Sequence, residues 1–106
     1  MKKYACHRLY GADRESVFHA QSVVCIDESG FVSSFYPLSC ETSHTEWVGG
    51  VIILSSTMDM KLENNFAFML QKYYSPQEKN LYAWHLSNFD FAKDDFSSQT
   101  VLSRLK

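Results

Sequence analysis

The sequence predicts an α+β fold, in which a mostly antiparallel sheet of about four to six strands carries one main helix (about residues 59–74) on one face. Three observations predict it. Trp47–Leu54 is the most apolar run in the chain, and its Val and Ile content favours a buried strand. Several shorter runs alternate in the manner of strands. A helical stripe follows the apolar run, and the length of 106 residues indicates a single domain, 1–106.

Three strands are expected before the apolar run. Residues 4–10 form the first, with Tyr4, Cys6, Arg8 and Tyr10 on one face and the intervening residues on the other. Residues 17–27 and 31–38 form the second and third. Asp27-Glu28-Ser29-Gly30 joins them, and a short polar turn ending in glycine is typical of a type I turn with a G1 bulge. Pro37 lacks an N–H group, which places the third strand at a sheet edge.

The apolar run is the expected central strand, from about residue 46 to 55. Gly49-Gly50 weighs against a helix there, and in a strand it indicates a bulge or a close approach of another backbone. It is not a phosphate loop, because no Gly-Lys-Ser/Thr sequence follows.

The character of the sequence changes after Ser56. Leu62, Phe66, Met69, Leu70 and Tyr73 share one helical stripe. We expect Ser56 or Asp59 to cap the start of this helix, and Ser75 before Pro76 to end it. Ser75-Pro76-Gln77-Glu78 is typical of a second, short helix start.

The C-terminal third is less regular. Tyr82, Trp84 and Leu86 alternate with Leu81, Ala83 and His85, which favours a strand over residues 81–87. Val101, Leu102 and Leu105 are expected to dock the C-terminus, and the sequence leaves open whether they do so as a strand or as a short helix.

Charge is unevenly distributed in a chain of net charge −2. No Lys or Arg occurs from Val17 to Met60, whereas Asp27, Glu28, Glu41, Glu46 and Asp59 do. Nucleic-acid binding needs a basic stripe, so neither nucleic acid nor an anionic membrane surface is an expected partner. The basic N-terminus is followed by no apolar h-region, and no apolar run is long enough to span a membrane. We therefore expect a cytoplasmic protein.

Cysteine and histidine spacing predicts neither a metal site nor a cofactor. Cys6, Cys25 and Cys40 show no CxxC spacing and are expected to be reduced structural thiols. No HxH or HExxH motif occurs among His7, His19, His44 and His85. Cys25 lies between Val24 and Ile26, which is the setting of an inert thiol. No residue is assigned a catalytic role.

The hairpin Val23–Val32, followed by Val48–Leu54, resembles the small β composite domain of amidohydrolase-superfamily enzymes. The resemblance covers residues 17–56. It implies a β arrangement only, because Ser55-Ser56-Thr57 stands where those enzymes carry a Pro-Gly-Phe-Ile-Asp segment, and the His-x-His motif and the length for a metal barrel are lacking.

Two functional hypotheses follow. The first is a non-enzymatic interaction or accessory module that self-associates, since one helix covers one face of the sheet and leaves an aromatic-rich face for a second copy or another protein partner. The second is a small-ligand-binding protein or minor enzyme. Its pocket would be lined by His44, Glu46, Trp47, Trp84 and His85. These polar and aromatic residues lie at the start of the expected central strand and within the strand expected over residues 81–87.

Overall fold

The computed structural model describes residues 2–11, 19–38, 44–62, 64–73 and 80–106. These ranges contain eight strands and one helix. The strands are β1 (Lys2–Cys6), β2 (Arg8–Tyr10), β3 (Ser22–Ile26), β4 (Val32–Pro37), β5 (Thr45–Trp47), β6 (Val51–Ser55), β7 (Tyr82–Asp90) and β8 (Asp95–Leu105), and the helix is α1 (Phe66–Tyr73).

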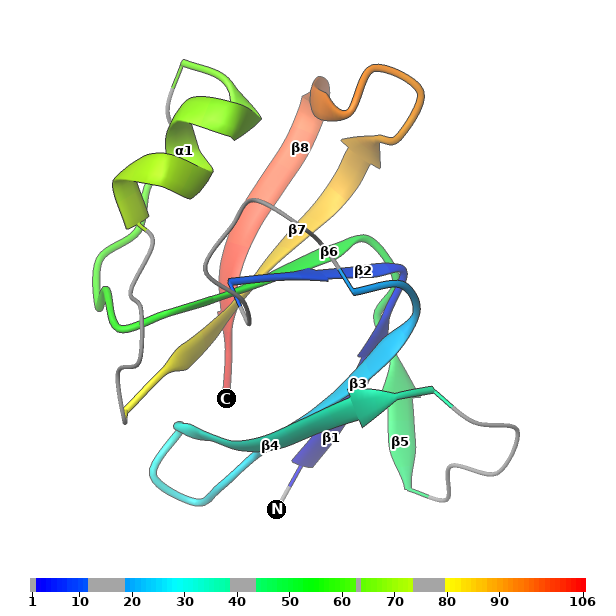
Figure 1. Cartoon of the computed structure of the whole chain (residues 1–106), viewed down its shortest axis with the longest axis vertical. Coiled ribbons are helices and arrows are strands. Elements are labelled where there is room, and N and C mark those ends of the chain that lie inside the picture. Colours follow the sequence, from blue (N-terminus) through cyan, green and yellow to red (C-terminus); the bar gives the residue numbers. More distant parts are fainter. Residues whose placement is uncertain (1, 12–18, 39–43, 63, 74–79) are drawn as a thin grey trace.

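The strands form two four-stranded sheets, one drawn mainly above the other in Figure 1. The first sheet has the order β4-β3-β1-β5, and the second has the order β2-β6-β7-β8. Both are mixed, because β1 pairs with β5 and β2 pairs with β6 in parallel, while the other pairs are antiparallel.

Two expected strands are each divided between the sheets. The chain passes from β1 to β2 through His7, and from β5 to β6 through Val48, Gly49 and Gly50; we call these four residues the crossover. Backbone hydrogen bonds hold its two chain segments together. The N–H of Val48 donates to the carbonyl of Ala5 (3.0 Å), and the N–H of His7 donates to the carbonyl of Gly50 (3.1 Å).

The crossover changes which side chains face inward. Cys6 and Leu9 both lie in the cluster between the sheets, although they are three positions apart in the sequence. Strict alternation would place them on opposite faces. The face expected for residues 4–10 is therefore wrong beyond Cys6, because His7 shifts the phase by one residue.

The main core lies between the two sheets. Its buried members come from both of them: Tyr4, Cys6, Leu9, Val24, Ile26, Ile52, Leu54 and Ala83. Burial on both faces explains why the run from Val51 to Leu54 is apolar without alternation: neighbouring residues pack against different layers.

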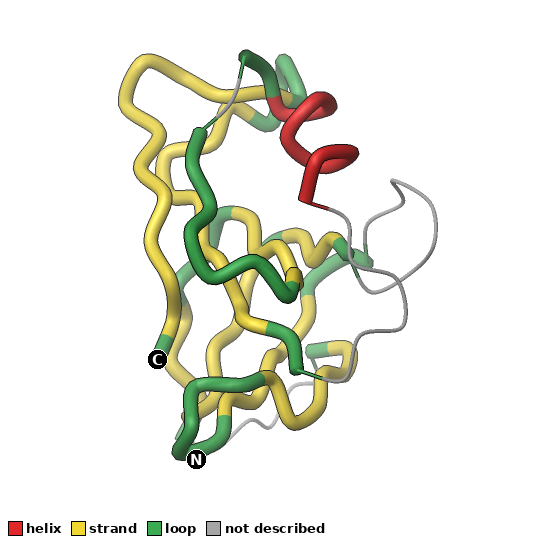
Figure 2. Tube along the Cα trace, turned by 90° about the vertical axis from the view of Figure 1, so that its left-hand side faces the viewer, coloured by secondary structure: helices red, strands yellow, loops and turns green. Residues whose placement is uncertain are grey.

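A second cluster covers the other face of the second sheet, where α1 and the segment before it pack. Its buried members are Tyr10, Val51, Ile53, Met60, Phe66, Met69, Trp84, Leu86 and Phe89. Figure 2 shows the helix on one side of the strands. A third, smaller cluster of Ala5, Val23 and Cys25 lies in the first sheet.

The predicted fold class is wrong. The described chain is mostly β, with two mixed sheets in place of one mostly antiparallel sheet, and its helix has eight residues instead of spanning 59–74. The expected stripe is correct from Phe66 onward, but Leu62 is exposed. The helix begins late because Asn65 caps it: its Oδ1 accepts the N–H of Phe68 at 2.8 Å.

A tertiary contact also determines where α1 begins. Asp95 of β8 accepts the N–H of Phe66 through Oδ1 at 2.9 Å, which supplies an acceptor to a first-turn amide. Neither Ser56 nor Asp59 lies next to the first turn, so the expected caps are wrong. The end expected at Ser75 and the second helix start at residues 75–78 lie outside the described residues.

The hairpin expectations are confirmed. The N–H of Gly30 donates to the carbonyl of Asp27 at 3.0 Å, and Gly30 has a φ of 89°. Oδ1 of Asp27 also accepts the N–H groups of Ser29 and Phe31. Pro37 ends β4, which is the terminal strand of the first sheet, as its missing N–H predicts.

The C-terminus is a strand. β8 pairs antiparallel with β7, which itself extends beyond the expected residue 87 to Asp90. The register shifts between Ser87 and Phe89, where Asn88 adopts a φ of 57°. Of the three cysteines, Cys6 and Cys25 are buried free thiols, and Cys40 lies outside the described residues.

Candidate functional site

The crossover brings residues from both sheets to one place on the surface. Its backbone is unusually close to β7: a Cβ atom on Gly50 would lie 2.3 Å from the carbonyl oxygen of Leu86. Gly50 also has a φ of 59°, in the region that favours glycine. The close backbone approach expected at Gly49-Gly50 is therefore confirmed.

The side chain of His7 bonds to the other segment of the crossover on its solvent-exposed side. Its Nδ1 accepts the N–H of Gly50 at 2.9 Å, so this nitrogen carries no proton. The imidazole packs edge-on against two aromatic rings, those of Trp47 (centroids 4.8 Å apart) and Phe91 (5.2 Å). We call Trp47, His7 and Phe91 the aromatic surface.

Trp47 is the most prominent member of the aromatic surface. It lies at the end of β5, which is the other terminal strand of the first sheet, and the residue is 50 % exposed. The contact with His7 restrains a large apolar ring at the surface. Such a ring offers binding area without further loss of rotamer entropy.

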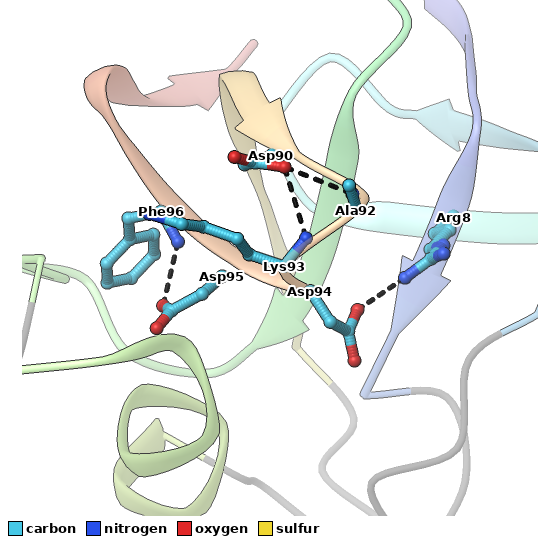
Figure 3. Close-up of polar contacts among 7 residues, drawn as sticks. All are labelled: Arg8, Asp90, Ala92, Lys93, Asp94, Asp95 and Phe96. Atoms are coloured by element: carbon cyan, nitrogen blue, oxygen red, sulfur yellow. Dashed lines mark hydrogen bonds and ion pairs between the residues drawn. The ribbon is translucent and has the colours of Figure 1, made fainter.

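An ion pair borders the aromatic surface. Arg8 of β2 binds Asp94 of the β7–β8 turn, as Figure 3 shows. The Arg8 guanidinium also lies over the Phe91 ring, 5.0 Å from its centroid. Asp90 shapes this turn, because its Oδ1 accepts the N–H groups of Ala92 and Lys93 (Figure 3).

The side chain of His85 contacts the crossover on its buried side. It lies on β7, is 9 % exposed, and its Nε2 is 3.1 Å from the carbonyl oxygen of Gly49. Burial lowers the pKa of His85, and hydrogen bonds to the carbonyls of Gly49 and Val48 partly oppose that shift. His85 is thus a neutral, structural histidine in the folded protein near neutral pH.

The burial of His85 predicts a pH dependence of stability. Because its pKa is lowered from the usual 6.5, the unfolded chain binds the proton at a higher pH than the folded chain. This contribution to stability is full above about pH 6.5 and declines as the pH falls. We expect urea unfolding between pH 8 and 5 to show a smaller decline for His85→Gln than for the wild type.

His44→Gln is the matched control for that titration, because His44 is an exposed histidine of the same protein. It should retain the wild-type decline. An equal decline in His85→Gln and the wild type would show that another group carries the pH dependence.

The structure places the five residues of the expected pocket in several settings. Trp84 belongs to the core beneath α1, and its indole N–H donates to the carbonyl of Thr57 at 3.0 Å. Trp47 and His85 both flank Gly49. His44 and Glu46 line a shallow hollow of about 230 Å³ with Lys2, Lys3 and Tyr4.

Sequence reasoning missed His7, Arg8, Phe91 and Asp94. Alternation assigns His7 to one face of a regular strand. Arg8, Phe91 and Asp94 lie in segments without a motif that indicates a functional site. A usable signal does exist: Cys6 and Leu9 are both apolar yet out of phase, which indicates an irregularity at the residues between them. Phe91 and Asp94 reach the crossover only through the β7–β8 turn.

Other groups in the described ranges define no second chemical site. The described residues hold no group of three or more His, Cys, Asp or Glu side chains arranged to bind a metal ion. Burial raises the pKa of the Cys6 thiol to about 11, so it is protonated at neutral pH and is a poor nucleophile. A hollow of about 350 Å³ lies between the ends of β3 and β4, beside His19 and Phe35.

Within the parts of the chain that the structure describes, no helix has the length and apolar character needed to span a bilayer.

Comparison of the chain with family models, with curated proteins and with solved structures gave no significant match. The resemblance of residues 17–56 to the amidohydrolase β composite domain therefore stays a prediction. The structure defines the class only as a small two-sheet β protein with one short helix.

Proposed function

We propose that this protein is a non-enzymatic interaction module that self-associates through its aromatic surface. The half-exposed indole of Trp47, held against His7, is the observation that carries the proposal. Tryptophan is enriched among the residues that dominate binding energy at protein interfaces. A cytoplasmic location belongs to the same proposal.

The setting of Trp47 supports binding to a second copy. β5 is a short terminal strand, so one of its edges is not paired within the first sheet. The neighbouring Arg8 guanidinium is matched by Asp94, which leaves little net charge to repel an identical surface. Aromatic rings with an Arg beside them are the composition typical of interface centres.

Native mass spectrometry and light scattering over a concentration series test this proposal. We expect a wild-type dimer and a weakening of about 30-fold or more in Trp47→Ser, the effect of losing an interface residue worth about 2 kcal/mol. Phe68→Ser is the matched control, since Phe68 is an equally exposed aromatic residue (46 %) on α1. It should dimerise like the wild type.

Two outcomes would contradict the proposal. A wild-type protein that stays monomeric at all concentrations would exclude self-association. A dimer that survives Trp47→Ser but is lost in Phe35→Glu would move the interface to β4, where Phe35 is 40 % exposed at the opposite edge of the first sheet.

A further inference from the structure

We propose that His7 is a proton-sensitive latch on the aromatic surface: unprotonated at Nδ1, it holds Trp47 in the binding arrangement, and protonation releases it. This inference rests on the proposed function for its effect on binding, but the latch itself is a property of the single chain. The proposal gives a regulatory role to the side chain that accepts the N–H of Gly50 in the crossover.

The hydrogen bond between His7 and Gly50 defines the latch. A backbone N–H can only donate, so Nδ1 of His7 must present a lone pair to it. In the imidazolium both ring nitrogens carry protons, and Nδ1–H would then face the N–H of Gly50. Two donors cannot share that position, so protonation of Nδ1 requires the ring to turn away.

The backbone limits the change to the side chain. The N–H groups of His7 and Arg8 both donate to the carbonyl of Gly50, and neither bond involves the imidazole. These backbone hydrogen bonds of the crossover therefore remain when the ring turns. What is lost is the edge-on packing of the imidazole on Trp47 and Phe91, which fixes the aromatic surface.

Among the described residues, the charged groups to consider around His7 come from β2, β5, β7 and the β7–β8 turn. β2 contributes Arg8, which is paired with Asp94 of the β7–β8 turn. That turn also carries Lys93, and Asp90 ends β7 just before it. On the inner side of the crossover, β7 contributes His85, whose Nε2 is engaged with the carbonyl of Gly49. β5 presents Trp47, while the adjacent Glu46 lies on the opposite face of the strand. The segment leading into β6 contributes no charged side chain among its described residues, Val48, Gly49 and Gly50.

His7 is exposed, so water and protons reach the ring directly. Histidine is the side chain that ordinarily titrates between pH 5 and 8. Loss of one hydrogen bond of ordinary strength changes an equilibrium by about fivefold. We therefore expect the dimer to weaken by about fivefold or more between pH 8 and pH 5.

The first test needs no variant and no partner. In the NMR spectrum of the wild-type protein at a concentration low enough to be monomeric, the Gly50 amide resonance and its hydrogen exchange are followed from pH 8 to pH 5, together with the His7 ring protons. The latch predicts that the Gly50 shift follows the His7 titration and that amide protection decreases with it. A Gly50 amide that is indifferent to the His7 titration would overturn the latch.

The second test uses His7→Asn, whose side-chain oxygen can accept the Gly50 N–H but does not titrate. We expect His7→Asn to dimerise with little pH dependence, and His7→Ala to dimerise weakly at every pH. His44→Gln is the matched control and should retain the wild-type pH dependence.

The two tests separate the two claims. A Gly50 amide that follows His7 in a protein that never dimerises would sustain the latch and refute the proposed function. A dimer whose affinity is unchanged from pH 8 to 5 would overturn the regulatory role of His7 while leaving the module intact.

Discussion

Gly50→Ala is expected to lower the free energy of unfolding by about 3 kcal/mol or more, and to leave little folded protein if the wild type is only marginally stable. The added Cβ would lie 2.3 Å from the carbonyl oxygen of Leu86 and 3.2 Å from Nε2 of His85. The first contact is with backbone in the middle of β7, which cannot move without disturbing the second sheet. The positive φ of Gly50 adds further strain.

Gly30→Ala is the control that separates strain from crowding. Gly30 also has a positive φ, but no atom lies within 4 Å of the position that an added methyl group would take. We expect a loss of only about 1 kcal/mol there, from conformation alone. Urea unfolding monitored by circular dichroism measures both variants. Equal losses at the two glycines would contradict a close backbone contact at the crossover.

Phe66→Ala is expected to cost about 3–5 kcal/mol, the range for deleting a buried phenylalanine. Phe66 is 3 % exposed, and its ring contacts aromatic rings on three strands. Its ring packs edge-on against Tyr10 of β2 and Phe89 of β7, with centroids 4.9 and 4.7 Å away, and lies 6.0 Å from Phe96 of β8. Removing it leaves a cavity between the helix and the second sheet.

Phe68→Ala provides the comparison within the same helix. Phe68 is 46 % exposed, so its removal should change stability by less than about 1 kcal/mol. Thermal unfolding of the two variants, with the wild type, measures the difference directly. Similar losses in both variants would show that α1 does not dock through Phe66, and the packing described for the second sheet would then be wrong.

Local sequence patterns predicted the positions of most strands but not their assembly. The hairpin turn at Asp27–Gly30 is built from its own residues, so its sequence was enough to identify it. The alternation of residues 81–87 likewise predicted a strand. Both of its faces are buried, with Trp84 beneath α1 and Ala83 between the sheets. Such signals arise within a few residues and need no distant partner.

The candidate site was only partly predictable, because several of its residues are distant from one another in the sequence. Trp47 and His85 stand out in the sequence as polar-aromatic residues, and both lie beside Gly49. Arg8 and Asp94 lie 86 residues apart along the chain, and only the pairing of β2, β6, β7 and β8 brings them together. The helix start depends on Asp95 in the same way, because an acceptor from β8 meets the amide of Phe66.

The sequence by itself determined where the chain turns, which runs are apolar on both faces and where glycine must stand, because these depend on the preferences of neighbouring residues. Tertiary structure alone decided that two continuous runs, residues 4–10 and 46–55, each serve two sheets. The physical reason lies in the crossover: His7 and Gly49-Gly50 bend two adjacent strands at the same point, and the hydrogen bonds that stabilise each bend come from the other chain segment.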